Sequence, residues 1–305
     1  MTASDLPTVS ISLLPPVDIA TSVAHLGRWG DDGLDRWDGH SLVRTVRLPG
    51  ADQPIPYVAT IDGDSFHPAL RATFGTNAVE VAGDLAAAVA ATFVTSRPNL
   101  EALAATDPAI GRLHDLYPGI VPVLITDPFT ALIRSISAQQ VNLRWASTIR
   151  RRLAESYGMR HEVAGDYVYT LDAAALANAT VEQLRILQLT NAKSRSVIAC
   201  AQAQARGDLE AADLDALDDE QLIERLTRLP GIGRWSAEWF LSRTLGRPRV
   251  VAGDLGVRKA VGRMYEAGPR PPEERVRQLT AHWGGSATSI QTLALHDLAV
   301  AAGVA

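Results

Sequence analysis

The chain of 305 residues has one cysteine and no apolar run long enough to span a membrane. A single cysteine excludes a disulfide framework and is typical of a protein of the reducing cytoplasm. Because Ile198, Ala199 and Ala201 surround it, we expect Cys200 to be a buried small residue and not a reactive thiol. The seven histidines show no metal-ligand spacing, so the sequence predicts no catalytic metal centre and no cofactor.

Net positive charge is also lacking, since the formal net charge is −5. This balance is unusual for a DNA-binding protein, but the charges are unevenly distributed. Residues 1–110 include 6 basic and 13 acidic residues, whereas residues 225–270 include 10 basic and 3 acidic residues. Arg144, Arg150, Arg151 and Arg152 form a second basic cluster. Local basic surface can bind phosphates on an acidic molecule, although we expect several of these arginines only to solvate helix faces.

The first 85 residues have the pattern of an antiparallel sheet. Apolar and polar residues alternate in three runs separated by turn-rich breaks, at 9–13, 42–48 and 57–61. Helical patterns interrupt these runs at 18–29 and 68–74. We therefore predict an α+β protein, with a mixed α/β antiparallel-sheet domain at 1–85 and a helical domain at 86–305.

Helix-start signals recur throughout the second part of the chain. The expected helices span 84–94 (capped by Asp84), 108–116, a stretch beginning at Pro128, 142–157, 173–178, a stretch capped by Thr180 and Gln183, and 193–205. The acidic segment 207–219 is expected to be a solvated connector.

A helical hairpin is predicted at about 218–246. Asp218 and Gln221 form a capping box for the first helix, and Pro230 ends that helix near Leu229. The second helix is expected to begin near Arg234 and to run to about Leu245.

The turn of this hairpin contains Gly231 and Gly233, which can both adopt positive φ and let another molecule approach the backbone. A helix start flanked by glycine exposes N–H donors and the positive end of the helix dipole, which favours a phosphate. An ordinary helical corner is the alternative interpretation. The Leu-Pro pair before the turn and Arg234 after it favour the phosphate site.

Asp254 follows an apolar, strand-like pair, Val250 and Val251, and precedes a helix whose buried side we expect to contain Leu255, Val257, Ala260 and Val261. It is thus expected at a helix N-cap, a role that contributes roughly 1 kcal/mol. The same position would hold the carboxylate ionised and directed at an incoming group. These two roles are compatible.

Four stretches in this order resemble the helix-hairpin-helix/Gly-Pro-Asp superfamily of DNA glycosylases, and most of all its 3-methyladenine DNA glycosylase II branch. They are 127–141, 187–195, 229–239 and 252–254, within a region of similarity from about 110 to 300. The resemblance implies two helical subdomains around a cleft and a base-excision-repair enzyme. It also implies a monomer that binds double-stranded DNA containing a damaged base.

In that family the aspartate assists cleavage of the N-glycosidic bond, so the resemblance assigns Asp254 this catalytic role. Bond breakage builds positive charge on the sugar, which a carboxylate stabilises. An alkylated purine is already cationic and leaves easily. Trp235 occupies the position where strand-cutting relatives have a lysine, so we expect a monofunctional hydrolase without lyase activity. Trp235 and Trp239 are expected to form the base pocket, with helix packing as the alternative role.

The resemblance further implies a set of DNA contacts. The family inserts the loop containing Gln139 and Gln140 into the minor groove, and Gln140 matches the residue that fills the space of the extruded nucleotide. The expected DNA-binding residues are Gln139, Gln140, Lys193, Arg195, Gly231, Gly233, Arg234 and Arg258. A monovalent cation is expected on the backbone carbonyls of Thr227, Leu229 and Ile232.

The chain also departs from the branch. Where relatives have a Trp-Arg-Ser-Tyr motif, this chain has Trp283–Ser289, which implies an altered base-pocket wall; Gly253 replaces the usual proline. The N-terminal domain is expected to be largely structural, and one cysteine excludes a four-cysteine iron–sulfur cluster. A glycosylase for a deaminated or oxidised base, or a non-catalytic hairpin DNA-binding protein, are the alternatives. A mere binding module would not require Asp254.

Overall fold

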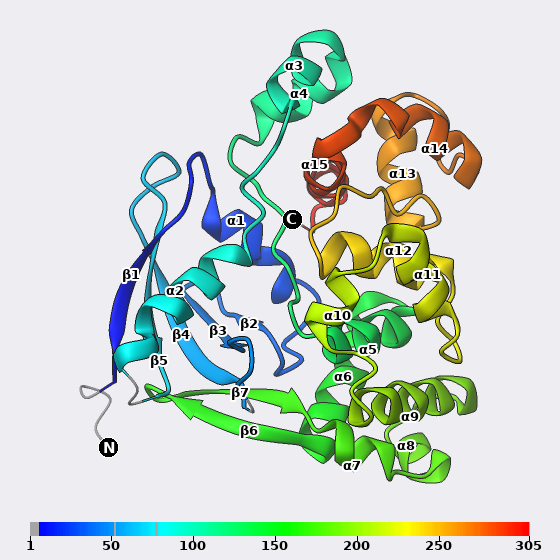
Figure 1. The fold of residues 1–305 in the computed structure, drawn as a ribbon. Coiled ribbons are helices and arrows are strands. Elements are labelled where there is room, and N and C mark those ends of the chain that lie inside the picture. The colour runs from blue at the N-terminus through cyan, green and yellow to red at the C-terminus, as the bar shows by residue number, and fades with distance from the viewer. Residues whose placement is uncertain (1–5, 52, 77–78, 305) are drawn as a thin grey trace.

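A computed structural model describes residues 6–51, 53–76 and 79–304. Its N-terminal part is a five-stranded antiparallel sheet with the strand order β1-β5-β4-β3-β2 (Figure 1). The strands are β1 (Thr8–Ser12), β2 (Arg36–Trp37), β3 (Ser41–Val46), β4 (Ile55–Asp62) and β5 (Ala69–Phe74). The three alternating runs in the sequence correspond to β1, β3 and β4, and the predicted α+β class is confirmed.

Residue alternation gives the sheet two different apolar faces. Leu42 on β3 and its cross-strand partner Ala59 on β4 belong to a core with Leu85 and Val89 of α2 (Ala82–Ala91). Val43 pairs with Val58 and faces the opposite side, where Val163 and Val168 of a second, two-stranded sheet pack against it. This sheet is the hairpin of β6 (Gly158–Val163) and β7 (Asp166–Leu171), which lies along the larger sheet in Figure 1.

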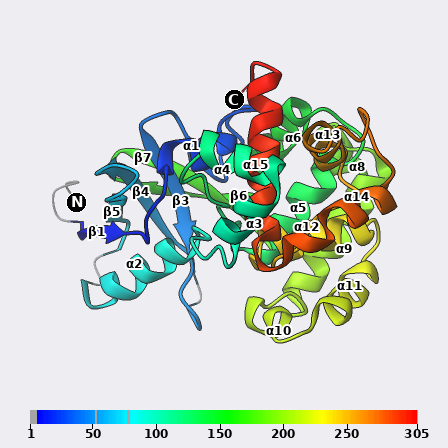
Figure 2. The same ribbon diagram turned by 90° about the horizontal axis from the view of Figure 1, so that it is seen from above.

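The remaining elements are mainly helices. Figure 2 shows most of them on one side of the molecule, with the sheet and helix α1 (Ile19–Val23) on the other side and α15 between them. They are α1 (Ile19–Val23), α3 (Leu100–Thr106), α4 (Pro108–Leu116), α5 (Pro128–Ala138), α6 (Leu143–Tyr157), α7 (Ala173–Ala177), α8 (Val181–Ile186), α9 (Asn191–Ala205), α10 (Ala211–Asp215), α11 (Asp219–Thr227), α12 (Arg234–Arg243), α13 (Leu255–Met264), α14 (Glu273–Thr280) and α15 (Ala287–Ala301). No helix in the described residues is long and apolar enough to cross a membrane.

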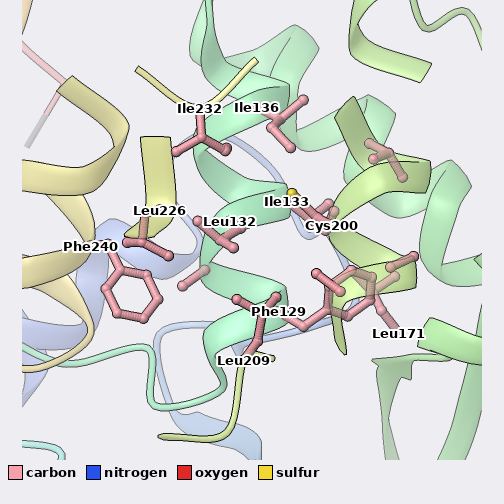
Figure 3. Close-up of a cluster of buried hydrophobic side chains, with 14 of the residues drawn as sticks. Phe129, Leu132, Ile133, Ile136, Leu171, Cys200, Leu209, Leu226, Ile232 and Phe240 are labelled. Atoms are coloured by element: carbon pink, nitrogen blue, oxygen red, sulfur yellow. The ribbon is translucent and has the colours of Figure 1, made fainter. Parts of the chain in front are cut away.

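The helical part is organised around α5. Phe129, Leu132 and Ile136 of this helix are buried in one core with Leu226 of α11 and Phe240 of α12 (Figure 3). Cys200 also lies in this core, and burial raises the pKa of its thiol to about 12. The expected burial of Cys200 is therefore confirmed. Because α5 packs against both α9 and α12, it fixes the hairpin relative to the loop that follows α5.

A buried ion-pair cluster joins α5 and α6 to the segment before β2. Arg134 of α5 donates to both Asp32 and Asp35, at 2.6 Å each, and Arg150 of α6 donates to Asp32 at 2.7 Å. Arg44 of β3 donates to Asp35 at 2.6 Å. These guanidinium groups hold the pKa of both carboxyls below its usual range, against the effect of burial.

Several sequence predictions were wrong. The segment 68–74 is strand β5 and not a helix, and the hairpin β6–β7 interrupts the region that we expected to be wholly helical. The helical pattern at 18–29 yields only α1 and a 3₁₀ turn at Ala24–Leu26. Val81, and not Asp84, occupies the N-cap of α2. The segment 207–219 contains α10 and buries Leu209 and Leu214, so it is not simply solvated.

Helix starts were predicted more accurately. The helices expected at 108, Pro128 and 142 are α4, α5 and α6, which Asp107, Asp127 and Asn142 cap, and the predicted capping boxes of α8 and α11 are both present. A domain boundary at residue 85 stays a prediction. The sheet core also includes Phe93, Val121 and Val123, so the chain returns to the sheet after leaving it.

Candidate active site

The hairpin turn between α11 and α12 has two glycines in different conformations. Gly231 has a φ of 79°, and a Cβ there would lie 2.0 Å from the Ser196 hydroxyl of α9. Gly233 has a φ of −99°, so the predicted positive φ holds for Gly231 alone. Gly233 is the N-cap of α12, with no side-chain cap and open space where a Cβ would project. The start of α12 is therefore accessible to a ligand.

Asp254 is the N-cap of α13, as predicted. Its Oδ1 accepts from the backbone N–H of Val257 at 3.0 Å, and its Oδ2 accepts from the indole N–H of Trp235 at 3.1 Å. Neither oxygen makes an ion pair with a described residue. Leu255, expected to be buried, is 48% exposed, and Val250 and Val251 form no strand. The carboxyl group is thus oriented by two N–H donors and makes no salt bridge with a described residue.

Asp254 lines a large cavity of about 1110 Å³. Trp235 and Trp239 of α12 lie on its wall, together with Gln139 and Gln140 of the loop between α5 and α6. We call the loop of Gln139 and Gln140 the plug loop, because Gln140 is predicted to fill the space of an extruded nucleotide. The structure therefore brings the predicted catalytic residue, the predicted base-pocket residues and the plug loop to one cavity.

Two further segments contribute to the cavity wall. Residues 21–30 contribute Thr21, Ser22, His25, Leu26, Arg28, Trp29 and Gly30, and the C-terminal helix α15 contributes Thr292, Leu295, His296, Leu298 and Ala299. Part of the predicted N-terminal domain thus lines the cavity, and its expected largely structural role stays a prediction. The altered segment 283–289 does not line the cavity; Trp283 is fully buried and donates to the Tyr265 hydroxyl at 2.9 Å. An altered base-pocket wall, relative to the family branch, stays a prediction.

Two side chains predicted to contact DNA connect turns of the protein to one another. Gln139 donates to the carbonyl oxygen of Gly231 at 2.9 Å, and Lys193 donates to the carbonyl oxygen of Ser137 at 2.9 Å. Burial lowers the pKa of Lys193. Gln140, by contrast, is exposed, has a φ of 55° and makes no side-chain hydrogen bond within the described part of the chain. Gln140 is therefore free to contact a ligand.

Most arginines of the basic stretch 225–270 are paired within the protein. Arg234 binds Glu220 and the buried Glu238, and Arg258 donates to the carbonyl oxygen of Pro271. Ion pairs with acidic side chains also engage Arg228, Arg247, Arg249 and Arg263. Among the described residues, the basic side chains that are exposed and have no such partner include Arg144, Arg195, Lys259 and Arg270. Local positive charge is thus smaller than the sequence count suggests.

The hairpin turn also contains the predicted cation site. The carbonyl of Leu229 accepts from the N–H of Ile232 at 3.1 Å, and a monovalent cation on Thr227, Leu229 and Ile232 stays a prediction.

The sequence missed some residues of the cavity wall. His25, Arg28 and Arg243 line the cavity, yet the sequence did not single them out as site residues. Arg243 was visible only as one of ten basic residues, and no local pattern relates His25 to Asp254.

Comparison with known proteins agrees with this geometry. Residues 133–285, half of the chain, match the family described as HhH-GPD superfamily base excision DNA repair protein. The chain belongs to this superfamily. The matched range contains the plug loop, the hairpin and Asp254, so the resemblance noted in the sequence is confirmed.

Individual relatives agree with the family. The chain is 24% identical over 183 residues to a DNA-3-methyladenine glycosylase of Bacillus subtilis, covering 59% of this chain and 60% of the relative. It is 31% identical over 135 residues to DNA-3-methyladenine glycosylase 2 of Escherichia coli, covering 44% and 47%. The chain thus spans about half to three fifths of these relatives. The fold is similar to that of a 3-methyladenine DNA-glycosylase from Archaeoglobus fulgidus, with a TM-score of 0.82, 22% identity and coverage of 95% and 98%.

Proposed function

We propose that this chain is a monofunctional DNA glycosylase that extrudes a damaged purine from duplex DNA and hydrolyses its N-glycosidic bond. The observation that carries the proposal is the position of Asp254, an unpaired carboxylate on the wall of a large cavity next to an accessible helix start. The relatives named as 3-methyladenine glycosylases support an alkylated purine as the substrate class.

The chemistry follows from where charge develops. As the C1′–N bond breaks, its electron pair leaves with the base and the deoxyribose becomes cationic. The Asp254 carboxylate, held by the N–H groups of Trp235 and Val257, stabilises that cation without reorientation. A water molecule then adds to C1′ and releases a proton, leaving an abasic site.

The hairpin and the plug loop would hold the DNA. The N–H groups at the start of α12, beside Gly233, can bind a phosphate, since a Cβ is absent there and the space is open. Gln140 projects from the loop at the cavity mouth without an internal partner, so it can replace the extruded base in the stack. Arg195 adds an unpaired positive charge near the Lys193 turn.

Absence of strand cleavage is supported by Trp235, which stands beside Asp254 where a nucleophilic lysine would be required. The amine of Lys193 is engaged by Ser137. Lys259 also lines the cavity, so its exposed amine is the one to test for a covalent intermediate. Trapping with borohydride on lesion-containing DNA should yield no covalent complex; a trapped complex lost in Lys259→Ala would show a lyase.

The catalytic assignment is tested with Asp254→Asn on duplexes that each contain one defined lesion, followed by alkali to reveal abasic sites. Asparagine caps a helix as well as aspartate does, so the fold is retained. Removal of the negative charge should lower the single-turnover rate by about a hundredfold or more, while duplex binding persists. Asp172→Asn, at the N-cap of α7, is the matched control and should not affect the rate. A parental rate in Asp254→Asn would remove the assignment.

A further inference from the structure

The carboxylate of Glu238 on α12 is almost fully buried, at 1% exposure, and arginine side chains surround it. Its Oε1 accepts from Nε of Arg234 at 3.1 Å, from Nη2 of Arg249 at 3.3 Å and from Nη2 of Arg277 at 2.9 Å. The same Nη2 of Arg277 also donates to Oε2 at 3.1 Å. A buried charge is tolerated where it is paired and hydrogen-bonded, so Glu238 depends on partners from elements that are separate in the sequence.

These partners attach α12 to the surroundings of Asp254. Arg249 belongs to the stretch of chain that connects α12 to Asp254, the N-cap of α13. Its ion pair with Glu238 therefore holds the backbone that leads to Asp254 against α12. Arg277 belongs to α14, so its ion pair holds a third helix against the same side chain.

Helix α14 in turn lies beside the residue that precedes Asp254. A Cβ added to Gly253 would lie 3.2 Å from Oε2 of Glu273 on α14 and 3.8 Å from the indole ring of Trp235 on α12. Glu273 is also bound by Arg277. The backbone at Gly253 is thus close to both helices that Glu238 and Arg277 join.

The hydrogen bond from Trp235 to Asp254 crosses the boundary that these ion pairs hold closed. Trp235 lies on α12 at i−3 from Glu238, so the two side chains are neighbours on the helix surface. The acceptor Asp254 lies on the separate segment that Arg249 anchors, and the N···O distance is 3.1 Å. Because a hydrogen bond weakens steeply as its distance and angle depart from the optimum, a small displacement of α12 from this segment would break it.

We propose that Glu238 is a positioning residue of the candidate site, whose carboxylate holds the segment before Asp254 and α14 against α12 and thereby keeps the indole N–H of Trp235 on Asp254. Its consequence for excision rests on the proposed function, whereas its consequence for the hydrogen bond does not. If Glu238 only stabilised the fold, its loss would lower stability and leave the contact between Trp235 and Asp254 unchanged in the folded protein.

The indole N–H of Trp235 reports on the hydrogen bond without requiring catalysis. In two-dimensional NMR spectra of the nitrogen-labelled full chain, its resonance is assigned by its absence in Trp235→Phe. Asp254→Ala gives the position of the resonance without the acceptor. In Glu238→Gln, which keeps the size of the side chain but not its charge, the resonance should move from the wild-type position toward that of Asp254→Ala. A resonance that stays in place in folded Glu238→Gln would overturn the inference.

Asp297→Asn is the matched control. Asp297 is also a buried carboxylate, at 6% exposure, and it is bound by Arg112 of α4 and Arg263 of α13. Arg263 lies at the opposite end of α13 from Asp254. Loss of this carboxylate should lower the free energy of unfolding without moving the Trp235 resonance. An equal movement in both variants would show a general effect of lost stability and would refute the positioning role.

Excision kinetics test the consequence for activity. Glu238→Gln should lower the single-turnover rate at saturating protein by about three- to tenfold, because the indole no longer holds the Asp254 carboxylate. Affinity for the same duplex should not fall, since removal of a negative charge does not weaken attraction to phosphates. In the Trp235→Phe background, which already lacks the indole N–H, Glu238→Gln should slow excision by less than about twofold more. Effects that multiply in the double variant, or a parental rate in Glu238→Gln of an active enzyme, would contradict the inference.

Arg277→Met removes the same contact from the side of α14 and is the second variant if Glu238→Gln does not fold. It should shift the Trp235 resonance in the same direction. A shifted resonance in a protein whose wild type excises none of the lesions would contradict the proposed activity and support the positioning role. Excision by the wild type, with the resonance and the rate unchanged in both variants, would overturn the positioning role and leave the glycosylase proposal standing.

Discussion

The side-chain amide of Gln139 donates to the carbonyl oxygen of Gly231 at 2.9 Å, which connects the loop after α5 to the turn of the hairpin. Lys193 reaches the same loop from α9 through the carbonyl of Ser137. The three turns predicted to face DNA are therefore joined to each other in the free protein. Gln139 and Lys193 position these turns, and under the proposed function the direct contacts fall to Gln140 and the start of α12.

Gln139→Leu should lower the free energy of unfolding by about 1 kcal/mol, because the hydrogen bond to Gly231 is lost at a half-buried position. Denaturant unfolding followed by circular dichroism measures this loss. Gln140→Leu is the matched control, since the side chain of Gln140 has no partner among the described residues. Equal stability of wild type and Gln139→Leu would show that the hydrogen bond between Gln139 and Gly231 contributes nothing to the free energy of unfolding.

Gln140→Gly should have opposite effects on stability and activity. Gln140 has a φ of 55°, which costs an L-residue but not glycine, so the free energy of unfolding should rise by up to about 1 kcal/mol. Excision from duplex DNA should fall because the plug is lost. A single-stranded substrate, which has no stack to fill, should be affected much less. A duplex rate equal to that of wild type would show that Gln140 does not fill the stack.

The accuracy of the sequence predictions depended on how local each signal is. The caps Thr180, Asp218 and Asp254 were predicted because a side chain and the N–H it binds lie within three residues. The segment 68–74 was mistaken for a helix because Ala, Leu and Arg favour helices, whereas pairing of β5 with β1 and β4 decides its structure.

The candidate site shows the same limit. Asp254, Trp235 and Gln140 lie in motifs whose order along the chain is informative. The part of the wall formed by His25 and Arg28 depends on the fold bringing residues 21–30 to the same cavity as α12 and α15, which the sequence pattern does not encode locally. The ion pairs that engage Arg234 and Arg249 likewise involve distant acidic residues, so the sequence overestimated the free positive charge.

Gly231→Ala and Gly233→Ala should separate folding from DNA binding. At Gly231 a Cβ would overlap the Ser196 hydroxyl at a φ of 79°, so we expect a loss of stability of about 2 kcal/mol or more. At Gly233 the φ of −99° suits alanine and the space is open, so the protein should fold normally. The added methyl would stand where a phosphate is expected, and duplex affinity should fall. Thermal unfolding and fluorescence anisotropy measure the two effects; unchanged affinity in Gly233→Ala would exclude the phosphate site.

Trp235→Phe should slow excision without greatly altering the cavity, because phenylalanine retains an aromatic ring but lacks the N–H that binds Asp254. Loss of one hydrogen bond to a charged group, worth about 1.5 kcal/mol, corresponds to a roughly tenfold lower single-turnover rate. Trp239→Phe is the matched control, since its indole makes no hydrogen bond within the described residues. Equal rates for both variants would show that Trp235 contributes packing alone.

The neutral state of His25 predicts a specific dependence of stability on pH. Burial lowers its pKa to about 3 in the folded protein, against 6.5 for an unperturbed histidine, so between these values the unfolded chain binds the extra proton. The free energy of unfolding therefore falls as the pH drops below about 6.5, by about 2 kcal/mol between pH 7 and pH 5 from this residue. His25→Gln cannot take up that proton, so its stability should decline less over the same range. Urea unfolding of both proteins at pH 7, 6 and 5 measures the difference, and parallel curves would show that His25 is protonated in the folded state.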